Sequence, residues 1–448
     1  MVSKKVSKIR TRFAPSPTGD LHIGGLRTAL YSYALAKHFG GDFILRIEDT
    51  DKKREKQGSK EKIVELLKLF GLNWDEYYVQ SERVKTGIYQ KAAHLLVEKG
   101  QAFYCQCPAR YSKKESSSNL LRDPCRDLNL REGAIKLKVP ENKIVSFRDF
   151  VLNKKVSWNT SSVADTTLLK SDGFPTYHLA AVVDDHEMKI THVLRGHDWM
   201  PSTPVHLLVY EYLGYKLPEI GHLTDILDPE GGKLSKRKGS VSCQALLDDG
   251  YLPEALLNFV MLLGWAPKDN RELFSLEDFV SVFDPNGFQK SNPVFNRDKL
   301  NWFNGEYIRK LPLDDLVERL NKLYRGKYKT SKIKEILPLV KERIRTLREF
   351  ESLAGFFFVR PNVDKSLLCP NYKEHLSSCI SVLESVSWDL NSINQSLMDK
   401  VKEKGFKTGD FFMDLRIAIT GSRVTPPINE SIIILGREEV LHRIKSLI

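Results

Sequence analysis

Apolar residues near the start of the chain alternate between two spacings. A short strand is predicted at Ile9–Phe13, with Arg12 inside it, and the compact apolar run Phe43–Ile47 is typical of a buried strand. Apolar residues recur at helical spacing in Leu26–Leu35, Lys60–Phe70 and Tyr89–Glu98. Strands separated by helices predict an α/β domain with a parallel sheet. In such sheets ligands bind beyond the carboxyl ends of the strands.

The pattern changes between residues 101 and 175. Short strands are predicted at Ile135–Val139, Ile144–Phe147 and Lys154–Trp158, without helices between them. We interpret this part as an insertion into the sheet domain. The α/β pattern then returns over residues 176–240.

That second α/β part contains apolar runs at Thr176–Val183 and Ile190–Arg195 and a helical pattern over Pro204–Leu213. Helices are predicted next at Leu252–Leu263 and Leu276–Phe283. From residue 306 the chain reads as amphipathic helix almost throughout.

In this helical part Leu313–Tyr324 is one run and Lys332–Phe350 another, with Pro338 expected to end a short helix and begin a second. The pattern therefore divides the chain into five segments: 1–100, 101–175, 176–240, 241–305 and 306–448.

Length and charge narrow the class of protein. A chain of 448 residues is long enough for about two to four domains with sizeable cores. Its net charge of +12, from 69 Lys and Arg against 57 Asp and Glu, fits a polyanionic partner. No apolar run is long enough to cross a membrane, and Met1–Arg10 is not followed by the apolar stretch of a signal peptide. Six cysteines in a chain of this length do not form a disulfide framework, so we expect a reduced, cytoplasmic protein.

The first candidate site is the stretch Thr11–Gly25, TRFAPSPTGDLHIGG. Pro15 and Pro17 end the predicted strand, and a turn through Gly19 leads to His22 and the next helix. A strand, a glycine-containing turn and a helix start direct backbone N–H groups and a helix dipole at one point, which suits a phosphate. The alternative is a capped helix after a proline-rich turn.

A second stretch, Lys233–Lys238, follows the turn Asp228–Gly232. A cationic run is usually a solvated surface. Here a hydroxyl lies among the lysines after a glycine-rich turn, so the run can fold over a polyphosphate.

Together the two stretches resemble the HIGH and KMSKS signatures of class I aminoacyl-tRNA synthetases, in the forms HIGG and KLSKR. Arg46–Asp51, Pro175–Leu179, Val182–His186 and Leu194–Gly196 narrow the resemblance to bacterial-type glutamyl-tRNA synthetases. The resemblance covers nearly the full length. It implies a monomeric ligase that joins glutamate to tRNA-Glu with ATP and Mg²⁺.

The resemblance also assigns a role to each segment. Residues 1–100 and 176–240 would form a Rossmann-type catalytic domain, 101–175 an inserted acceptor-binding domain, 241–305 a stem-contact region and 306–448 an all-α anticodon-binding domain.

Recognition of glutamate requires cations for two carboxylates and an anion for the ammonium group. Arg12 and Arg195 suit the carboxylates because a guanidinium can bind both oxygens, and Glu48 suits the ammonium group. These residues match the family's glutamate site, which here comprises Arg12, Ala14, Ser16, Glu48, Tyr177 and Arg195. Ala181 stands where some relatives carry Asn, which removes one side-chain contact.

The reaction implied by the resemblance is attack of the glutamate α-carboxylate on the α-phosphate of ATP. It depends on positioning and charge stabilisation, which we assign to His22 and Lys236, assisted by Lys233 and Arg237. Trp199 is expected to pack on the adenine or ribose. The full ATP-binding set is Thr18, Gly19, His22, Gly24, Gly25, Trp199, Leu234, Ser235, Lys236 and Arg237.

Cys105, Cys107 and Cys125 fit part of a zinc knuckle, and some family members bind zinc here with a fourth ligand just after the last cysteine. That position is Asp127, with Tyr111 nearby. A structural zinc and three reduced, unpaired cysteines both remain open.

The helical part contains a candidate anticodon reader. Lys341–Phe350, KERIRTLREF, is predicted as a helix with a basic face. In the family an Arg in this domain reads the third anticodon base, and Arg343 resembles that position, with Arg345 and Arg348 as alternatives. Members with Arg there charge tRNA-Glu only.

Four other interpretations stay open: a glutaminyl-tRNA synthetase, a truncated relative that glutamylates a tRNA base, a non-discriminating enzyme that also charges tRNA-Gln, and a basic nucleic-acid-binding protein without chemistry. The predicted helices after residue 306 speak against the first two, because glutaminyl enzymes usually end in a β-barrel and the truncated relative lacks a helical C-terminal domain. The HIGG and KLSKR pair speaks against the last.

Overall fold

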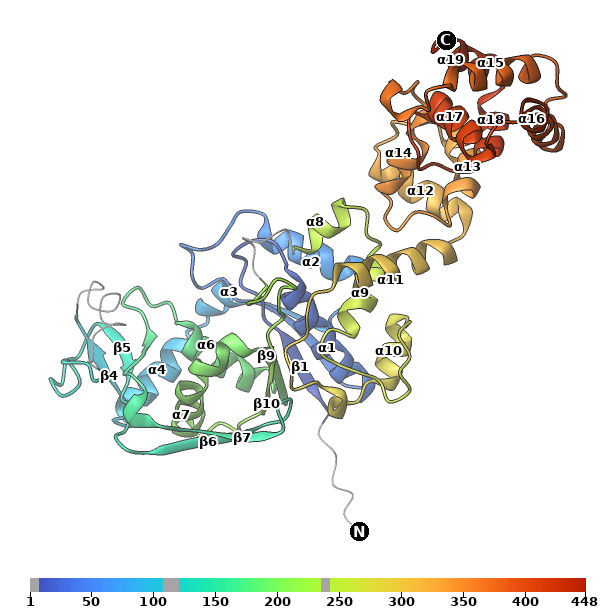
Figure 1. Ribbon diagram of the computed structural model, residues 1–448. Helices are drawn as coiled ribbons and strands as arrows, with labels where there is room; N and C mark the ends of the chain where they lie inside the picture. The colour runs from blue at the N-terminus through green and yellow to red at the C-terminus, as the bar shows by residue number, and fades with distance from the viewer. Residues whose placement is uncertain (1–7, 108–120, 235–241) are drawn as a thin grey trace. The chain divides into compact units, whose positions relative to one another are not determined.

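The computed structural model describes residues 8–107, 121–234 and 242–448 (Figure 1). The chain forms two compact units. The first unit comprises Met1–Leu246 and Leu256–Arg297, and the second comprises Leu247–Ala255 and Asp298–Ile448. This division is coarser than the five predicted segments, whose boundaries stay predictions.

The first unit begins with a parallel three-stranded sheet. Strands β1 (Arg10–Phe13), β2 (Asp42–Ile47) and β3 (Glu76–Val79) lie in that order, joined by helices α1 (Ile23–His38) and α2 (Ser59–Leu69). Every residue of β2 after Asp42 is buried, as its apolar sequence predicts. The predicted parallel α/β arrangement is confirmed.

A second sheet has the order β7-β6-β10-β9. Strands β6 (Ile144–Asp149), β10 (Glu219–Leu223) and β9 (His192–Gly196) are parallel, and β7 (Lys154–Asn159) pairs antiparallel with β6. The backbone N–H of Thr191, beside β9, donates to the carbonyl of Arg10 on β1 over 2.9 Å, so the two sheets adjoin. The carboxyl ends of β1 and β9 therefore meet at one edge.

The strands expected within the insertion divide between two sheets. The residues of β6 alternate between exposed and buried, and its buried face packs against helix α7 (Thr203–Leu213) (Figure 1). The β6–β7 hairpin thus belongs to the sheet of β9 and β10. A separate antiparallel sheet is formed by β4 (Ala102–Cys105), β5 (Ala134–Leu137) and β8 (Thr167–Leu169).

One core joins these parts. Helices α4 (Ile88–Glu98) and α6 (Tyr177–Glu187) bury side chains in the same cluster as Ile135 of β5 and Val193 of β9. Shorter helices are α3 (Gln80–Val84) and α10 (Leu276–Val282) in the first unit, and α8 (Cys243–Asp248) and α9 (Pro253–Met261), each of which contains residues of both units.

The second unit confirms the all-α prediction. Its helices are α11 (Arg297–Lys310), α12 (Leu313–Leu323), α13 (Thr330–Val340), α14 (Glu349–Ala354), α15 (Tyr372–Leu383), α16 (Leu390–Lys404), α17 (Thr408–Thr420), α18 (Ile428–Leu435) and α19 (Arg437–Lys445). They enclose two apolar clusters, one around α12–α14 and one around α15–α19.

The predicted helix over Lys341–Phe350 is wrong. Helix α13 continues through Pro338 to Val340, because its buried face packs in the core, and residues 341–348 then form turns. Backbone groups of these turns form hydrogen bonds with residues far away in sequence. The Leu347 N–H donates to the Gly250 carbonyl at 3.0 Å, and the Asn304 side chain donates to the Arg345 carbonyl at 2.6 Å. Tertiary hydrogen bonds thus replace the local helix.

In the part of the chain that the structure describes, no helix combines the length and the apolar character needed to span a membrane.

Candidate functional site

A cleft of about 550 Å³ opens at the carboxyl ends of β1, β2 and β9. All six residues predicted to contact glutamate line it: Arg12, Ala14, Ser16, Glu48, Tyr177 and Arg195. So do Lys233 and seven of the residues predicted for ATP: Thr18, Gly19, His22, Gly24, Gly25, Trp199 and Leu234. Ser235, Lys236 and Arg237 lie outside the described residues.

The segment between β1 and α1 forms one wall. Gly19 has a φ of 149°, in the region that disfavours residues with a side chain. His22 caps α1, and its Nδ1 accepts the N–H of Gly25 at 3.2 Å. Because Nδ1 is an acceptor, the ring proton lies on Nε2, which can donate to an anion.

The two glycines of HIGG lie against side chains of their own turn. A Cβ on Gly24 would lie 3.0 Å from Cε1 of His22, and one on Gly25 would lie 2.8 Å from Cδ1 of Leu21. A side chain at either position would therefore require His22 or Leu21 to shift.

Arg195 is a buried cation whose partners are all neutral. Its guanidinium donates to Nε2 of His222 at 2.9 Å, to the Tyr177 hydroxyl at 3.3 Å and to Oγ1 of Thr203 at 2.8 Å, and Nη1 lies 3.1 Å from Nδ1 of His206. None of its hydrogen-bond partners in residues 8–107, 121–234 and 242–448 is a carboxylate. A buried charge without a counter-ion is costly, so a bound anion would be stabilised here.

Tyr177, whose hydroxyl accepts from Arg195, packs against Trp199. Their ring centroids lie 4.2 Å apart, and Trp199 remains 41% exposed. Burial raises the pKa of Tyr177, so its hydroxyl keeps its proton and stays a donor to an anion.

Arg12 has a carboxylate partner, unlike Arg195. Its Nε lies 3.2 Å from Oδ1 of Asp185, and its Nη1 donates to the Leu194 carbonyl at 3.1 Å. Asp185 also accepts from Arg46 at 2.6 Å. The two arginines outweigh the effect of burial and lower the pKa of Asp185, which is therefore ionised.

Arg46 also holds Glu48. Its side chain is fully buried, and Nη2 donates to Oε1 of Glu48 at 3.0 Å. Burial raises the pKa of Glu48 even though Arg46 and Arg12 lie near. Sequence reasoning gave no role to Arg46 or Asp185, although both stand in stretches that carry the resemblance.

Lys233 lies at the cleft within a group of acids. Its ammonium pairs with Asp198 and with Oδ1 of Asp225, the latter at 2.9 Å. Burial lowers its pKa, but these hydrogen bonds and charges outweigh burial and raise the pKa overall. The predicted role of Lys233 did not foresee these two carboxylates.

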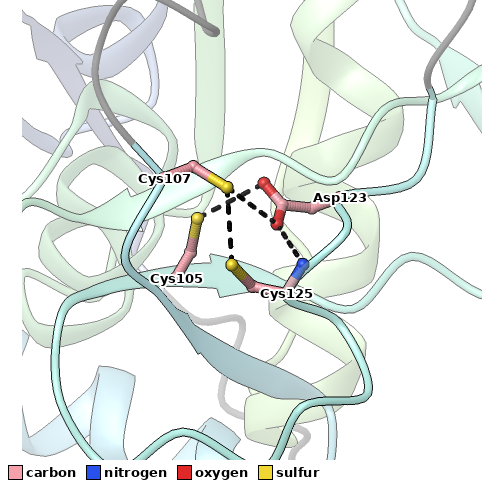
Figure 2. A group of neighbouring side chains, drawn as sticks. All are labelled: Cys105, Cys107, Asp123 and Cys125. Atoms are coloured by element: carbon pink, nitrogen blue, oxygen red, sulfur yellow. Dashed lines mark hydrogen bonds between the residues drawn. The ribbon is translucent and has the colours of Figure 1, made fainter.

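Figure 2 shows a second cluster, formed by Cys105, Cys107, Asp123 and Cys125, outside the cleft. Their ligand atoms all lie within 4.8 Å of one another. The sulfurs of Cys107 and Cys125 are 3.4 Å apart, and the Cys105 sulfur is 3.4 Å from Oδ2 of Asp123. Three sulfurs and one carboxylate within this distance fit a tetrahedral zinc ion.

The expected fourth ligand needs correction. Asp127 does not belong to the cluster: its side chain is 79% exposed and pairs with Lys138 at 2.9 Å. Asp123 takes that place because its Oδ1 accepts the N–H of Cys125 at 2.8 Å, which turns the carboxylate toward the sulfurs. Tyr111 lies outside the described residues.

The thiols of Cys105 and Cys107 favour protonation when no metal is bound, because burial raises the pKa of each. Burial raises the pKa of Cys105 to about 12. Lys136 pairs with Asp123. A zinc ion would hold the sulfurs as thiolates and compete with Lys136 for the carboxylate.

Comparisons with known proteins agree with this geometry. Residues 8–302 match the family described as tRNA synthetases class I (E and Q), catalytic domain, and residues 315–448 match an anticodon binding domain family. The chain is 40% identical to a glutamate–tRNA ligase of Dehalococcoides mccartyi, over 98% of this chain and 97% of that one. It is 39% identical to a glutamate–tRNA ligase of Clostridium acetobutylicum, over 98% of each.

The chain belongs to the glutamate–tRNA ligase family of class I tRNA synthetases. A crystal structure of a glutamate tRNA ligase from Elizabethkingia meningosepticum, in complex with its amino acid, superposes with a TM-score of 0.84. It is 34% identical and covers 98% of this chain and 99% of that one. The resemblance drawn from the motifs is thus confirmed, and so is the fold class.

Arg343, which is predicted from the sequence to read the anticodon, lies in the turns after α13 and is exposed. Burial and the nearby charge of Arg343 lower the pKa of Arg416 on α17, which places two cations close together in the second unit. Arg345 pairs with Glu349 at 3.0 Å, and Nε of Arg348 donates to the Asp248 carbonyl at 2.9 Å. Of the three candidates, Arg343 is the one whose side chain has no hydrogen-bond or ion-pair partner in the described part of the chain.

The cysteine cluster leads to a prediction about metal content. Protein purified without chelator should contain about one zinc per chain by elemental analysis, as a structural site requires. Cys125→Ser and Asp123→Ala should lower that content. Asp127→Ala is the matched control and should retain it. Wild-type protein free of zinc would leave three reduced cysteines as the correct interpretation.

Proposed function

We propose that this chain is a glutamate–tRNA ligase. It activates L-glutamate with ATP to glutamyl-adenylate and pyrophosphate, and it transfers the glutamyl group to the 3′-terminal adenosine of tRNA-Glu. The observation that carries the proposal is Arg195, a buried guanidinium whose partners in the described chain are neutral, in a cleft lined by the HIGG turn. An acidic amino acid beside a nucleotide is the substrate pair that fits both features.

Arg195 and Arg12 have different proposed roles in binding glutamate. The α-carboxylate is the nucleophile and must keep its electron density, so we assign the non-reacting side-chain carboxylate to Arg195, whose charge is uncompensated. Arg12, partly neutralised by Asp185, contributes positive charge nearby. Glu48 receives the ammonium group, and Ser16, Ala14 and Tyr177 complete the pocket.

ATP would bind along the turn that leads into α1. The Nε2–H of His22 and the first N–H groups of α1 offer hydrogen bonds to phosphate oxygens. Trp199 offers an exposed aromatic face for the base or ribose. Lys233, Ser235, Lys236 and Arg237 supply a hydroxyl and cations, and Mg²⁺ would enter with the phosphates and neutralise part of their charge.

The chemistry needs no strong base, because a carboxylate is already a nucleophile. The α-carboxylate oxygen bonds to the α-phosphorus as the bond to pyrophosphate breaks. Catalysis then depends on holding the reactants in line and stabilising charge on the phosphoryl oxygens. A zinc ion in the cysteine cluster would stabilise the sheet that contains β4 and would take no part in the reaction. The monomeric state and the cytoplasmic location stay predictions.

The proposal is tested by two assays on the purified protein. Glutamate-dependent ATP–pyrophosphate exchange should be observed in the presence of tRNA, and the assay without tRNA shows whether activation requires it. Aminoacylation should load glutamate on tRNA-Glu. Exchange with glutamine instead of glutamate would identify a glutaminyl enzyme, and no exchange with either amino acid would refute the proposal.

Arg12→Ala should raise the KM for glutamate by about tenfold or more, since a charge-assisted interaction is lost in a buried site. Arg10→Ala is the matched control on the same strand: Arg10 pairs with Asp42 and Glu76, and it does not line the cleft. Steady-state exchange kinetics should show an unchanged KM in Arg10→Ala. Equal glutamate KM values in both variants would show that Arg12 does not contribute to glutamate binding.

Lys236→Ala should lower kcat for adenylate formation by about 100-fold or more with little change in the glutamate KM, because a group that stabilises transition-state charge is removed. Circular dichroism should confirm that the variant is folded. An unchanged kcat in a folded variant would show that the KLSKR stretch is not catalytic.

Arg343→Gly should raise charging of tRNA-Gln relative to tRNA-Glu and leave pyrophosphate exchange intact. A guanidinium donates to the O2 and N3 acceptors of C but meets N–H donors on G, a mismatch worth about 1–3 kcal/mol by analogy with base-edge readout in duplexes. Arg345→Gly and Arg348→Gly, tested in parallel, separate the three candidate positions. Wild-type enzyme that charges both tRNAs equally would contradict the assignment.

A further inference from the structure

Three buried side chains on neighbouring strands form a chain that ends at the cleft. Asp149 is the last residue of β6, His222 lies on β10 and Arg195 on β9. His222 and Arg195 lie opposite each other on the parallel strands β10 and β9. Asp149 lies opposite Ile220 of β10 and is the first of the three hydrogen-bonded side chains. Asp149 and His222 are both 0% exposed. Neither lines the cleft, so neither can touch a substrate there.

The hydrogen bonds determine the tautomer of His222. Its Nδ1 lies 2.7 Å from Oδ2 of Asp149, and its Nε2 lies 2.9 Å from Nε of Arg195. Arginine can only donate, so Nε2 must be the acceptor and the ring proton must lie on Nδ1. The carboxylate thus holds the imidazole in the one form that can accept from Arg195.

Asp149 is itself oriented by backbone groups. Its Oδ1 accepts the N–H of Val151 at 3.0 Å and of Leu152 at 2.9 Å, and its Oδ2 also lies 3.2 Å from the backbone nitrogen of His222. With both oxygens engaged by donors, the carboxylate cannot rotate without breaking several hydrogen bonds.

Placing an imidazole between the acid and the arginine has an electrostatic consequence. A carboxylate in direct contact would neutralise Arg195, as Asp185 partly does for Arg12. Burial lowers the pKa of His222 despite Asp149, and burial lowers the pKa of His206 still further below its usual range. Both rings are neutral acceptors, so they aim the guanidinium and leave its charge for a ligand.

We propose that Asp149 and His222 are positioning residues that set the selectivity of the enzyme for an acidic side chain over its amide. Asp149 holds the tautomer of His222, and His222 holds the Arg195 guanidinium in place without neutralising it. The inference rests on the proposed function, because Arg195 is assigned there to the side-chain carboxylate of glutamate.

Asp149→Asn provides a near-isosteric test. If the Asn oxygen keeps the Val151 and Leu152 N–H groups, its NH₂ faces Nδ1 of His222 and makes that nitrogen the acceptor. The ring proton then moves to Nε2, where it meets the Nε–H of Arg195, donor against donor. The KM for glutamate should rise by about tenfold or more, as expected for losing a hydrogen bond to a charged group, with kcat at saturating glutamate nearly unchanged.

Substitutions at His222 separate positioning from packing. His222→Leu removes the acceptor and should raise the glutamate KM as Asp149→Asn does. His222→Gln can accept from Arg195 through its carbonyl and donate to Asp149 through its amide, so it should restore much of the affinity. In the impaired variants the kcat/KM ratio of glutamate over glutamine should fall, and the KM for ATP should not change.

The second unit offers a matched control. His375 and Asp414 form another buried pair, with Nδ1 and Oδ2 2.6 Å apart, and neither belongs to the cleft. Asp414→Asn makes the same chemical change and should lower the melting temperature without moving the glutamate KM at saturating tRNA. A general loss of stability is thereby distinguished from a loss of positioning.

The outcomes are separable. Wild-type enzyme that fails to activate glutamate refutes the proposed function. Active wild type with unchanged glutamate KM and selectivity in folded Asp149→Asn and His222→Leu overturns the positioning role. If either variant does not fold, His222→Gln is compared with His222→Asn, whose side chain is too short to reach Arg195. Wild-type selectivity in His222→Gln together with reduced selectivity in His222→Asn supports the positioning role. Equal selectivity in these two variants refutes it.

Discussion

The cleft depends on the ion pairs that the fully buried guanidinium of Arg46 makes with two carboxylates. This guanidinium lies between Asp185 of α6, at 2.6 Å, and Glu48, which follows β2, at 3.0 Å. Removing one partner of such a buried pair would cost about 3–5 kcal/mol, because the remaining charge could not be solvated. The bridge therefore ties a helix from the second half of the α/β region to the end of a strand from the first half. Arg12, which shares Asp185, is held at the same edge.

The three buried arginines of this region differ in how they are compensated. Arg46 lies among carboxylates and is structural. Arg12 shares one carboxylate and lines the cleft. Arg195 contacts only neutral acceptors within the described residues, so it carries the charge that is left for a ligand. The difference in their proposed roles follows from their partners rather than from the residue type.

In the second unit, too, the arginines differ in their partners. The turns at 341–348 owe their shape to hydrogen bonds with Gly250 and Asn304, and the apolar face of α13 is buried below them. Arg345 and Arg348 are engaged with Glu349 and the Asp248 carbonyl, whereas Arg343 is the position proposed to read the anticodon. The charge of Arg343 lies close enough to Arg416 to lower the pKa of that residue.

The sequence by itself determined the elements and most of the residues of the cleft. Apolar spacing located β2, α1 and α2, because these elements bury side chains in a pattern that is visible locally. Strands such as β10, EIGHL, escaped prediction because a short segment with a buried histidine has no clear apolar period. The motifs placed Arg12, Glu48, Tyr177 and Arg195 at strand ends or helix starts, and parallel strands bring such positions to one edge.

Only the tertiary structure decided which partners these residues have. The choice of Asp123 over Asp127 depends on a backbone hydrogen bond within a turn, and the loss of the helix after Val340 depends on Gly250 and Asn304, which lie far away in sequence. The chain Asp149–His222–Arg195 joins residues up to 73 positions apart. Such contacts form when strands pair, so no local pattern records them. The sequence determined which charges this protein carries, and the fold decided which of them are neutralised.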